Sequence, residues 1–174
     1  MAQKSAEAGH VGAQCLLGSI YGGHVGVELE SRDPIASAKW YRRAANQGSA
    51  QAQTELGDMY AAGLGVPQNL AEAARWYRAA AEQRSLESWP AGKAESSLGY
   101  MYAVGEGVPQ DFAEAAKLFR MAAERHHWCR ENESNFRGYE ERIHFLPAVD
   151  AAERAWLCEA AERGWALVPG IRAE

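Results

Sequence analysis

Three related copies of one segment occupy most of this chain, and their recurrence limits the fold more than any other feature. "YAAGLGVPQNLAEAARWYRAAAEQ", from Tyr60 to Gln83, returns as "YAVGEGVPQDFAEAAKLFRMAAER", from Tyr102 to Arg125. A longer copy runs from Tyr21 to Gly48. The related pieces AQCLLGSIY, AQTELGDMY and AESSLGYMY each end on the tyrosine that opens a copy. Such self-similarity is the signature of a stacked repeat, in which each unit buries its apolar face against its neighbours.

The spacing of the copies defines the unit. Trp40 and Trp76 are 36 residues apart, whereas Trp76 and Leu118, which replaces a third tryptophan, are 42 apart. Tyr21 and Tyr60 are 39 residues apart, and Tyr60 and Tyr102 are 42 apart. A unit of 36 residues explains all four spacings, with three extra residues in the first loop and six in the connection around SLESWPAGK. Insertions confined to connections are what a stack of similar units tolerates.

Each unit predicts two helices joined by a glycine turn. The first helix of the second unit, residues 51–62, places four apolar side chains on one face: Ala52, Leu56, Met59 and Tyr60. Gly63 and Gly65 end it, because glycine readily adopts the left-handed angles of a C-cap. Asn69, and Asp111 in the third unit, supply the side-chain oxygen of an N-cap. The second helix then carries the apolar side chains Ala73, Trp76, Tyr77, Ala80 and Ala81.

Glycine also stands inside the first helices of the second and third units, at Gly57 and Gly99. It costs roughly 1 kcal/mol there relative to alanine, so its repetition predicts a helix crossing too close for a Cβ. The aromatic pairs 40–41 and 76–77 are expected to fill the volume between neighbouring units. An aromatic stripe that repeats with the unit indicates core rather than a cofactor site.

The repeated pattern A-Q-x-x-L-G-x-x-Y, then G-x-G-V, then A-x-x-W-Y-x-x-A-A-x-x-G resembles the Sel-one-like repeat (SLR), a relative of the tetratricopeptide repeat. In the second unit eight residues match it: Gly63, Gly65, Val66, Ala73, Trp76, Tyr77, Ala80 and Ala81. The third unit keeps Gly105, Gly107, Val108 and Ala115, with Leu118 and Phe119 in place of the Trp-Tyr pair. In the first unit the loop is longer, and His24 interrupts its glycines.

The resemblance implies an all-α fold, an α/α solenoid of helix-turn-helix repeats that curves into a right-handed superhelix with the first helices on its concave side. We expect residues 1–174 to form a single solenoid of five parts. These are the end of a preceding repeat (1–11), three repeats (12–48, 49–84, and 85–127 with its insert), and a divergent C-terminal repeat or cap (128–174). In the last part AAERAWLCEAAERGW aligns Trp156 with Trp76, although the G-x-G-V loop is missing.

Composition excludes several classes of partner. The net charge is -5 and only four lysines occur, whereas nucleic-acid binding requires a dense basic surface, so we expect no nucleic acid partner. No stretch approaches the roughly 18 consecutive apolar residues of a membrane-spanning helix, so no membrane insertion is expected.

This chain opens without a secretory signal peptide. The compartment therefore stays open: periplasmic if a signal was removed, and otherwise cytoplasmic.

Cysteine and histidine residues supply one candidate for a metal site. The segment RHHWC places His126, His127 and Cys129 close together, with His144 or Cys158 as further ligands. Zinc requires about four N/S ligands in a tetrahedron, and adjacent histidines on a helix point some 100° apart, so we expect polar and packing roles here and no metal. Three cysteines are too few for a disulfide framework, and a Cys129–Cys158 bridge is the alternative to three buried thiols.

No catalytic constellation accompanies the repeats. The chain has no G-x-S-x-G or S-x-x-K nucleophile signature, and neither GLGV nor GEGV continues into the Gly-Lys-Ser/Thr of a phosphate-binding loop. Paired carboxylates such as Glu140 and Glu141 fit a solvated helix face better than acid–base groups, which need burial to shift a pKa. We therefore expect no enzyme and no cofactor.

Positions that vary between the repeats are the candidates for partner recognition. On the first helices of the second and third units they are expected opposite the core face: Gln51, Thr54, Glu55, Asp58, Lys93, Ser96, Ser97 and Tyr100. Tyr100 is the expected anchor, since tyrosine combines a large rigid contact with a polar end. Trp89, in the polar insert, is either a second exposed anchor or a cover for a widened gap between repeats. For each position the alternative is an ordinary solvated helix residue.

These features favour a non-catalytic scaffold or adaptor that binds a protein or peptide partner on the concave face, because SLR proteins generally hold other proteins together. Bacterial members of the family include immunity proteins, so the resemblance suggests a secreted bacterial effector or toxin as one kind of partner. Two alternatives stay open: a hydrolase of cell-wall or β-lactam substrates, and a module that binds peptidoglycan fragments.

Overall fold

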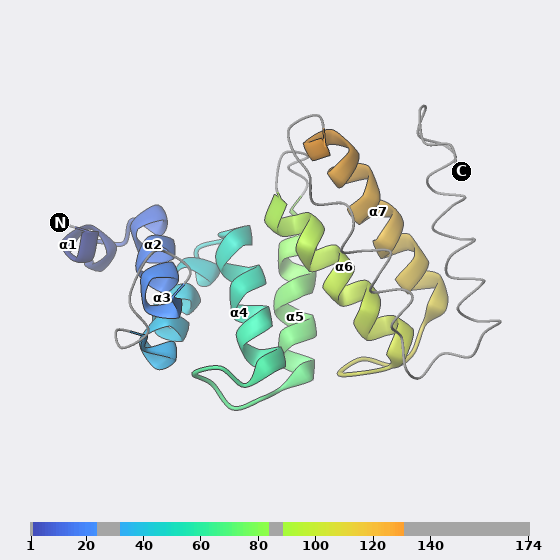
Figure 1. Cartoon of the computed structure of the whole chain (residues 1–174), viewed down its shortest axis with the longest axis horizontal. Helices are drawn as coiled ribbons and strands as arrows, with labels where there is room; N and C mark the ends of the chain where they lie inside the picture. The colour runs from blue at the N-terminus through green and yellow to red at the C-terminus, as the bar shows by residue number, and fades with distance from the viewer. Residues whose placement is uncertain (1, 24–31, 84–88, 131–174) are drawn as a thin grey trace. The chain divides into compact units, whose positions relative to one another are not determined.

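Helices are the only regular secondary structure in the described part of the chain. The computed structural model describes residues 2–23, 32–83 and 89–130, without the side chains of Trp89 and of residues 123–130. These ranges contain no strand, and their helices are α1 (Ala2–Glu7), α2 (Val11–Gly22), α3 (Pro34–Asn46), α4 (Ala50–Ala62), α5 (Leu70–Ala81), α6 (Trp89–Val104) and α7 (Phe112–Arg130) (Figure 1). The chain divides into two compact units, Met1–Gln83 and Arg84–Glu174, which are described one at a time.

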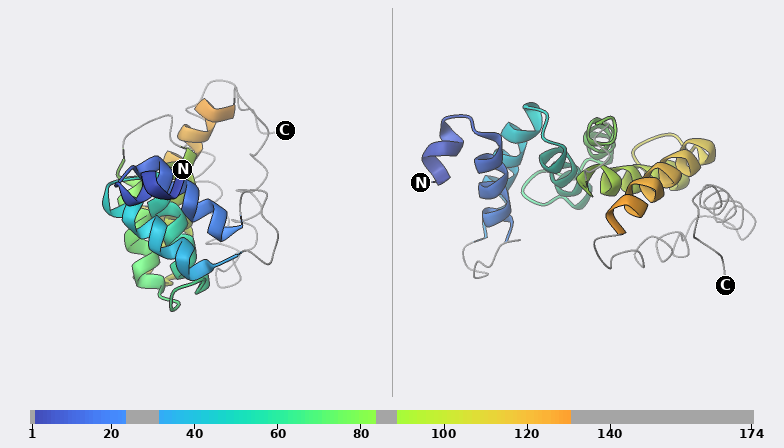
Figure 2. Two further views of the ribbon diagram at one scale, coloured as in Figure 1. Left: turned by 90° about the vertical axis from the view of Figure 1, so that its left-hand side faces the viewer. Right: turned by 90° about the horizontal axis from the view of Figure 1, so that it is seen from above.

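Helix pairs are the building block of both units. In the first unit α2 packs on α3 and α4 packs on α5, while in the second unit α6 packs on α7 (Figure 2). Within the first unit α3 also packs on α4, and α1 packs on α2. The predicted all-α fold of helix-turn-helix repeats is therefore confirmed.

Local sequence signals set the starts of the second helices. Asn69 accepts a hydrogen bond of 3.1 Å from the backbone N–H three residues later, at the start of α5. Asp111 accepts the equivalent bond of 3.0 Å at the start of α7, so both predicted N-caps are confirmed. Asp33 caps α3 in the same way, with a bond of 2.9 Å. Each cap satisfies a backbone donor that the first turn of a helix leaves without a partner.

Both glycines of the turn between α4 and α5 have a structural role. Gly63 ends α4 in the left-handed conformation, with a φ of 70°, and its N–H donates to the Met59 carbonyl. Gly65 has a φ of 68°, and a Cβ at this position would collide with the backbone carbonyl of Pro34 at the start of α3. The turn of one repeat therefore lies directly on the second helix of the preceding repeat, which requires a residue without a side chain.

The glycines inside the first helices accommodate an aromatic ring from the second helix of the same repeat. A Cβ on Gly57 would lie 2.6 Å from the ring of Tyr77, and one on Gly99 would lie 3.2 Å from the ring of Phe119. The close approach predicted at both glycines is confirmed. At Gly57 the approaching group is a ring alone, whereas at Gly99 the backbone carbonyl of Ala115 on α7 would lie at 3.3 Å, as close as the ring.

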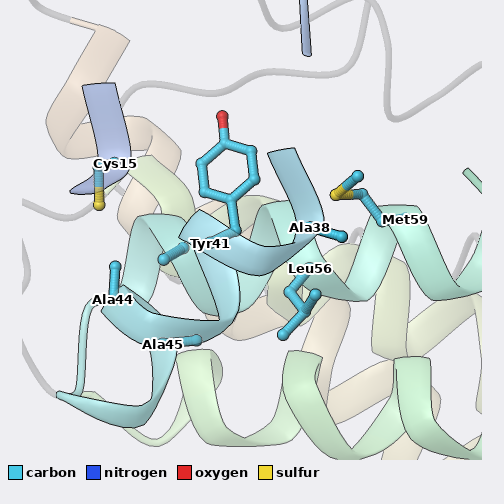
Figure 3. Close-up of a cluster of buried hydrophobic side chains, with 8 residues drawn as sticks. Cys15, Ala38, Tyr41, Ala44, Ala45, Leu56 and Met59 are labelled. Atoms are coloured by element: carbon cyan, nitrogen blue, oxygen red, sulfur yellow. The ribbon is translucent and has the colours of Figure 1, made fainter. Parts of the chain in front are cut away.

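The core of the first unit consists mainly of alanine with a few larger side chains. Eight buried residues from α2, α3 and α4 form one cluster (Figure 3): Cys15, Ala38, Tyr41, Ala44, Ala45, Ala52, Leu56 and Met59. Trp76 is only partly buried and packs against this cluster. Small side chains let the helix axes approach closely, so a few aromatic rings suffice to fill the remaining space.

A row of glutamine side chains joins successive helices of the first unit. Gln14 donates to a backbone carbonyl at the end of α1 over 3.0 Å, and Gln53 donates to the equivalent carbonyl at the end of α3 over 3.2 Å. The Oε1 of Gln14 in turn accepts from Gln47 over 2.7 Å, and that of Gln53 accepts from Gln83 over 2.8 Å. Each first helix is thereby tied to the second helix before it and to the end of its own repeat.

The second unit repeats the same local design. Ala103, Ala115 and Phe119 form its buried cluster between α6 and α7, and four partly buried side chains pack against it: Tyr100, Tyr102, Val104 and Phe112. In its turn Gln110 donates to the Ala103 carbonyl over 2.9 Å, as Gln68 does to the Ala61 carbonyl over 2.9 Å in the preceding repeat.

Candidate partner-binding face

One row of side chains along each first helix stays at least partly exposed. Its positions are spaced by four, three and four residues, which places them on one face of a helix. We call this set the first-helix row, and it comprises Gly12, Leu16 and Ser19 on α2, Gln51, Glu55, Asp58 and Ala62 on α4, and Lys93, Ser97, Tyr100 and Val104 on α6. Six of the predicted partner-binding residues lie in it: Gln51, Glu55, Asp58, Lys93, Ser97 and Tyr100.

Thr54 and Ser96 do not lie on this exposed row, contrary to their placement from the sequence. Each is only 1% exposed, and their hydroxyls donate to carbonyls of their own helices, over 2.9 Å and 3.2 Å. Cys15 occupies the same repeat position on α2, and its sulfur lies 3.3 Å from the Ser49 hydroxyl just before α4. In the first repeat this position therefore points toward the next first helix, where packing excludes solvent.

Trp89 cannot be assigned to either of its predicted roles. It is the first residue of α6, and its side chain lies outside the described part of the chain. Both roles, an exposed anchor and a cover for a widened gap between repeats, stay predictions.

Two positions of the first-helix row accept or share a hydrogen bond with the second helix of their own repeat. The Tyr77 hydroxyl donates to Asp58 Oδ1 over 2.6 Å. In the preceding repeat the hydroxyls of Tyr41 and Ser19 form a hydrogen bond of 2.9 Å. The buried tyrosine of the second helix thus reaches the first-helix row and presents its hydroxyl there.

Burial controls the protonation of this hydroxyl in the first repeat. Tyr41 is 1% exposed, and desolvation raises the pKa of Tyr41 from 10.0 to about 12, although the hydrogen bond with Ser19 opposes the shift. The charges of Glu55 and Asp58 also raise this pKa, so both carboxylates of α4 act on a hydroxyl that is bonded to α2. Helices α2 and α4 also contact each other directly.

The third repeat rearranges the tyrosine pair. Phe119 stands where Tyr77 stands, and Tyr100 stands where Asp58 stands, so the second helix has lost its hydroxyl and the first helix has gained one. Tyr100 is partly exposed and packs against the cluster that contains Phe119. No hydrogen bond among the described residues involves the Tyr100 hydroxyl.

These pairings could have been found by comparing the repeats with one another. The acceptor Asp58 occurs with Tyr77, whereas Tyr100 occurs with the hydroxyl-free Phe119. Two repeat positions that change together indicate contact. Helical spacing alone predicts that these first-helix positions face a partner, because it takes no account of the second helix.

The described residues bear on two further expectations, metal binding and membrane insertion. Among them no group of three or more His, Cys, Asp and Glu could hold a metal ion, and no described helix is long and apolar enough to cross a membrane. The candidate ligands His126, His127 and Cys129 have side chains outside the described part, and His144 and Cys158 lie outside it altogether.

A family model described as "Sel1 repeat" matches residues 11–49, 50–85 and 92–127. The chain is similar to a crystal structure of a Sel1 repeat protein from Oxalobacter formigenes, with 34% identity, a TM-score of 0.61, and coverage of 70% of this chain and 86% of that one. It is also similar to c5321, a protein with an SLR fold that is a protective antigen present in uropathogenic Escherichia coli strains, with 30% identity and a TM-score of 0.62.

The match to c5321 covers 98% of this chain but only 36% of the antigen, so the chain spans about a third of that protein's length. A third similar structure, the cysteine rich protein B of Helicobacter pylori, has 23% identity and a TM-score of 0.54 over 83% of this chain and 94% of that one, which supports the fold alone. No curated protein matches the chain.

Proposed function

Because this chain belongs to the Sel1 repeat family, whose members are generally scaffolds for protein interactions, we propose that it binds a partner protein through its first-helix row. The observation that carries the proposal is that the row is at least partly exposed on all three first helices while its side chains change from repeat to repeat. Buried neighbours such as Leu17, Leu56 and Leu98 stay the same. Positions that are both accessible and variable can distinguish one partner from another at little cost to the fold.

Tyr100 is the side chain of this row that best fits an anchor for the partner. Its ring is supported by the packing around Phe119, so little side-chain entropy would be lost on binding. Its hydroxyl takes part in no hydrogen bond among the described residues. In contrast, the Asp58 carboxylate already accepts from Tyr77 and helps to hold its own repeat together.

Affinity capture with single-residue variants tests this proposal. Tagged full-length protein is incubated with native lysate and envelope fractions, and a stoichiometric partner is then measured with purified components. Tyr100→Ala is expected to weaken binding about tenfold, the effect of losing one tyrosine hot spot. Arg120→Ala, an exposed residue on α7, is the matched control and is expected to leave the affinity unchanged.

A second substitution tests whether the partner contacts the row at a position other than Tyr100. Ser97→Arg places a bulky charged side chain in the row one turn before Tyr100 and is expected to weaken the same partner. If the partner binds the wild type, Tyr100→Ala and Ser97→Arg equally well, the proposed surface is wrong. Asp58→Arg is a poorer probe, because it also removes the acceptor of the Tyr77 hydroxyl.

The narrower hypotheses concern the identity of the partner. If the chain neutralises a secreted bacterial effector, the captured partner is a toxin and the complex suppresses its activity. A thermal-shift screen against peptidoglycan fragments, together with an activity-probe screen for hydrolases, tests the two alternatives. We expect neither to respond, and a shift or a labelled protein would contradict the scaffold proposal.

A further inference from the structure

We draw no further inference here: the strongest candidate, the apolar surface patch around the exposed side chains of Ile35 at the start of α3 and Leu64 in the turn between α4 and α5, where the backbone of Gly65 lies against that of Pro34, carries none, because nothing in the described part of the structure shows what covers it.

Discussion

The hydroxyl of Tyr77 donates to Asp58 Oδ1 over 2.6 Å, and this bond links the core of the second repeat to its exposed row. The ring of Tyr77 fills the space that Gly57 leaves open, and the hydroxyl emerges beside α4 to meet the carboxylate. Asp58 occupies a position that varies between the repeats, and in the second repeat its side chain stabilises the fold. The bond shows why exposure alone does not identify a residue that serves a partner.

Removing the donor of this bond should destabilise the protein. Tyr77→Phe is expected to lower the free energy of unfolding by about 1 to 2 kcal/mol, the range for a partly exposed hydrogen bond to a charged acceptor. Urea unfolding followed by circular dichroism measures the change. Tyr100→Phe removes a hydroxyl that has no hydrogen bond among the described residues, and it is expected to be neutral. Equal losses in the two variants would contradict the assigned role of the Tyr77 hydroxyl.

Adding a methyl group at the interior glycines should have unequal effects. Alanine gains about 1 kcal/mol of helix propensity over glycine, but on Gly57 its Cβ would lie 2.6 Å from the Tyr77 ring, and overpacking costs about 1 to 3 kcal/mol. Gly57→Ala is therefore expected to lower the melting temperature.

Two matched substitutions control this prediction. Gly99→Ala meets the Phe119 ring at 3.2 Å and is expected to be close to neutral, whereas Gly12→Ala meets nothing within 4 Å and is expected to stabilise slightly. Differential scanning fluorimetry ranks the three variants. A Gly57→Ala variant that is more stable than Gly12→Ala would refute the packing argument.

The glutamine row should be sensitive to loss of one member. Gln53 is 7% exposed, donates to the Ala45 carbonyl and accepts from Gln83. Gln53→Ala removes one hydrogen-bond partner from the Ala45 carbonyl and one from the Gln83 side-chain amide. The free energy of unfolding is expected to fall by about 2 to 3 kcal/mol, as for other buried polar groups that lose a hydrogen-bond partner. Gln51→Ala, an exposed glutamine on the same helix, is the control, and denaturant unfolding of both variants measures the difference.

Alkaline pH should weaken the folded state through Tyr41. The pKa of Tyr41 is about 12 in the folded protein, whereas tyrosine in an unfolded chain has the ordinary value of 10.0. Between pH 10 and pH 12 the hydroxyl is therefore deprotonated in the unfolded chain and still protonated in the folded one. The stabilising contribution is complete below pH 10 and is lost as the pH rises toward 12, by about 2 to 3 kcal/mol in all. Unfolding measured at pH 8, 10 and 11 is expected to show the decline. Tyr41→Phe, which cannot titrate, should decline less, and an equal decline would contradict the assignment.

The features that the amino-acid sequence determined by itself are local or repeated. The period of 36 residues, the paired helices, the glycine turn at Gly63 and Gly65 and the N-caps at Asn69 and Asp111 were all predicted from residue type and spacing. They depend on backbone angles, on helix ends and on the need of each unit to bury one face, and these constraints act within a few residues or recur with the repeat.

Only the tertiary structure decided which polar residues of the first helices are accessible. Thr54 and Ser96 were placed on the exposed face by their helical spacing, yet both are buried. Asp58 was placed there correctly but is bonded to Tyr77. Helical periodicity gives the direction of a side chain only relative to the axis of its own helix. Whether that edge meets water or another helix depends on how neighbouring helices pack, and this is determined by residues far away in the sequence.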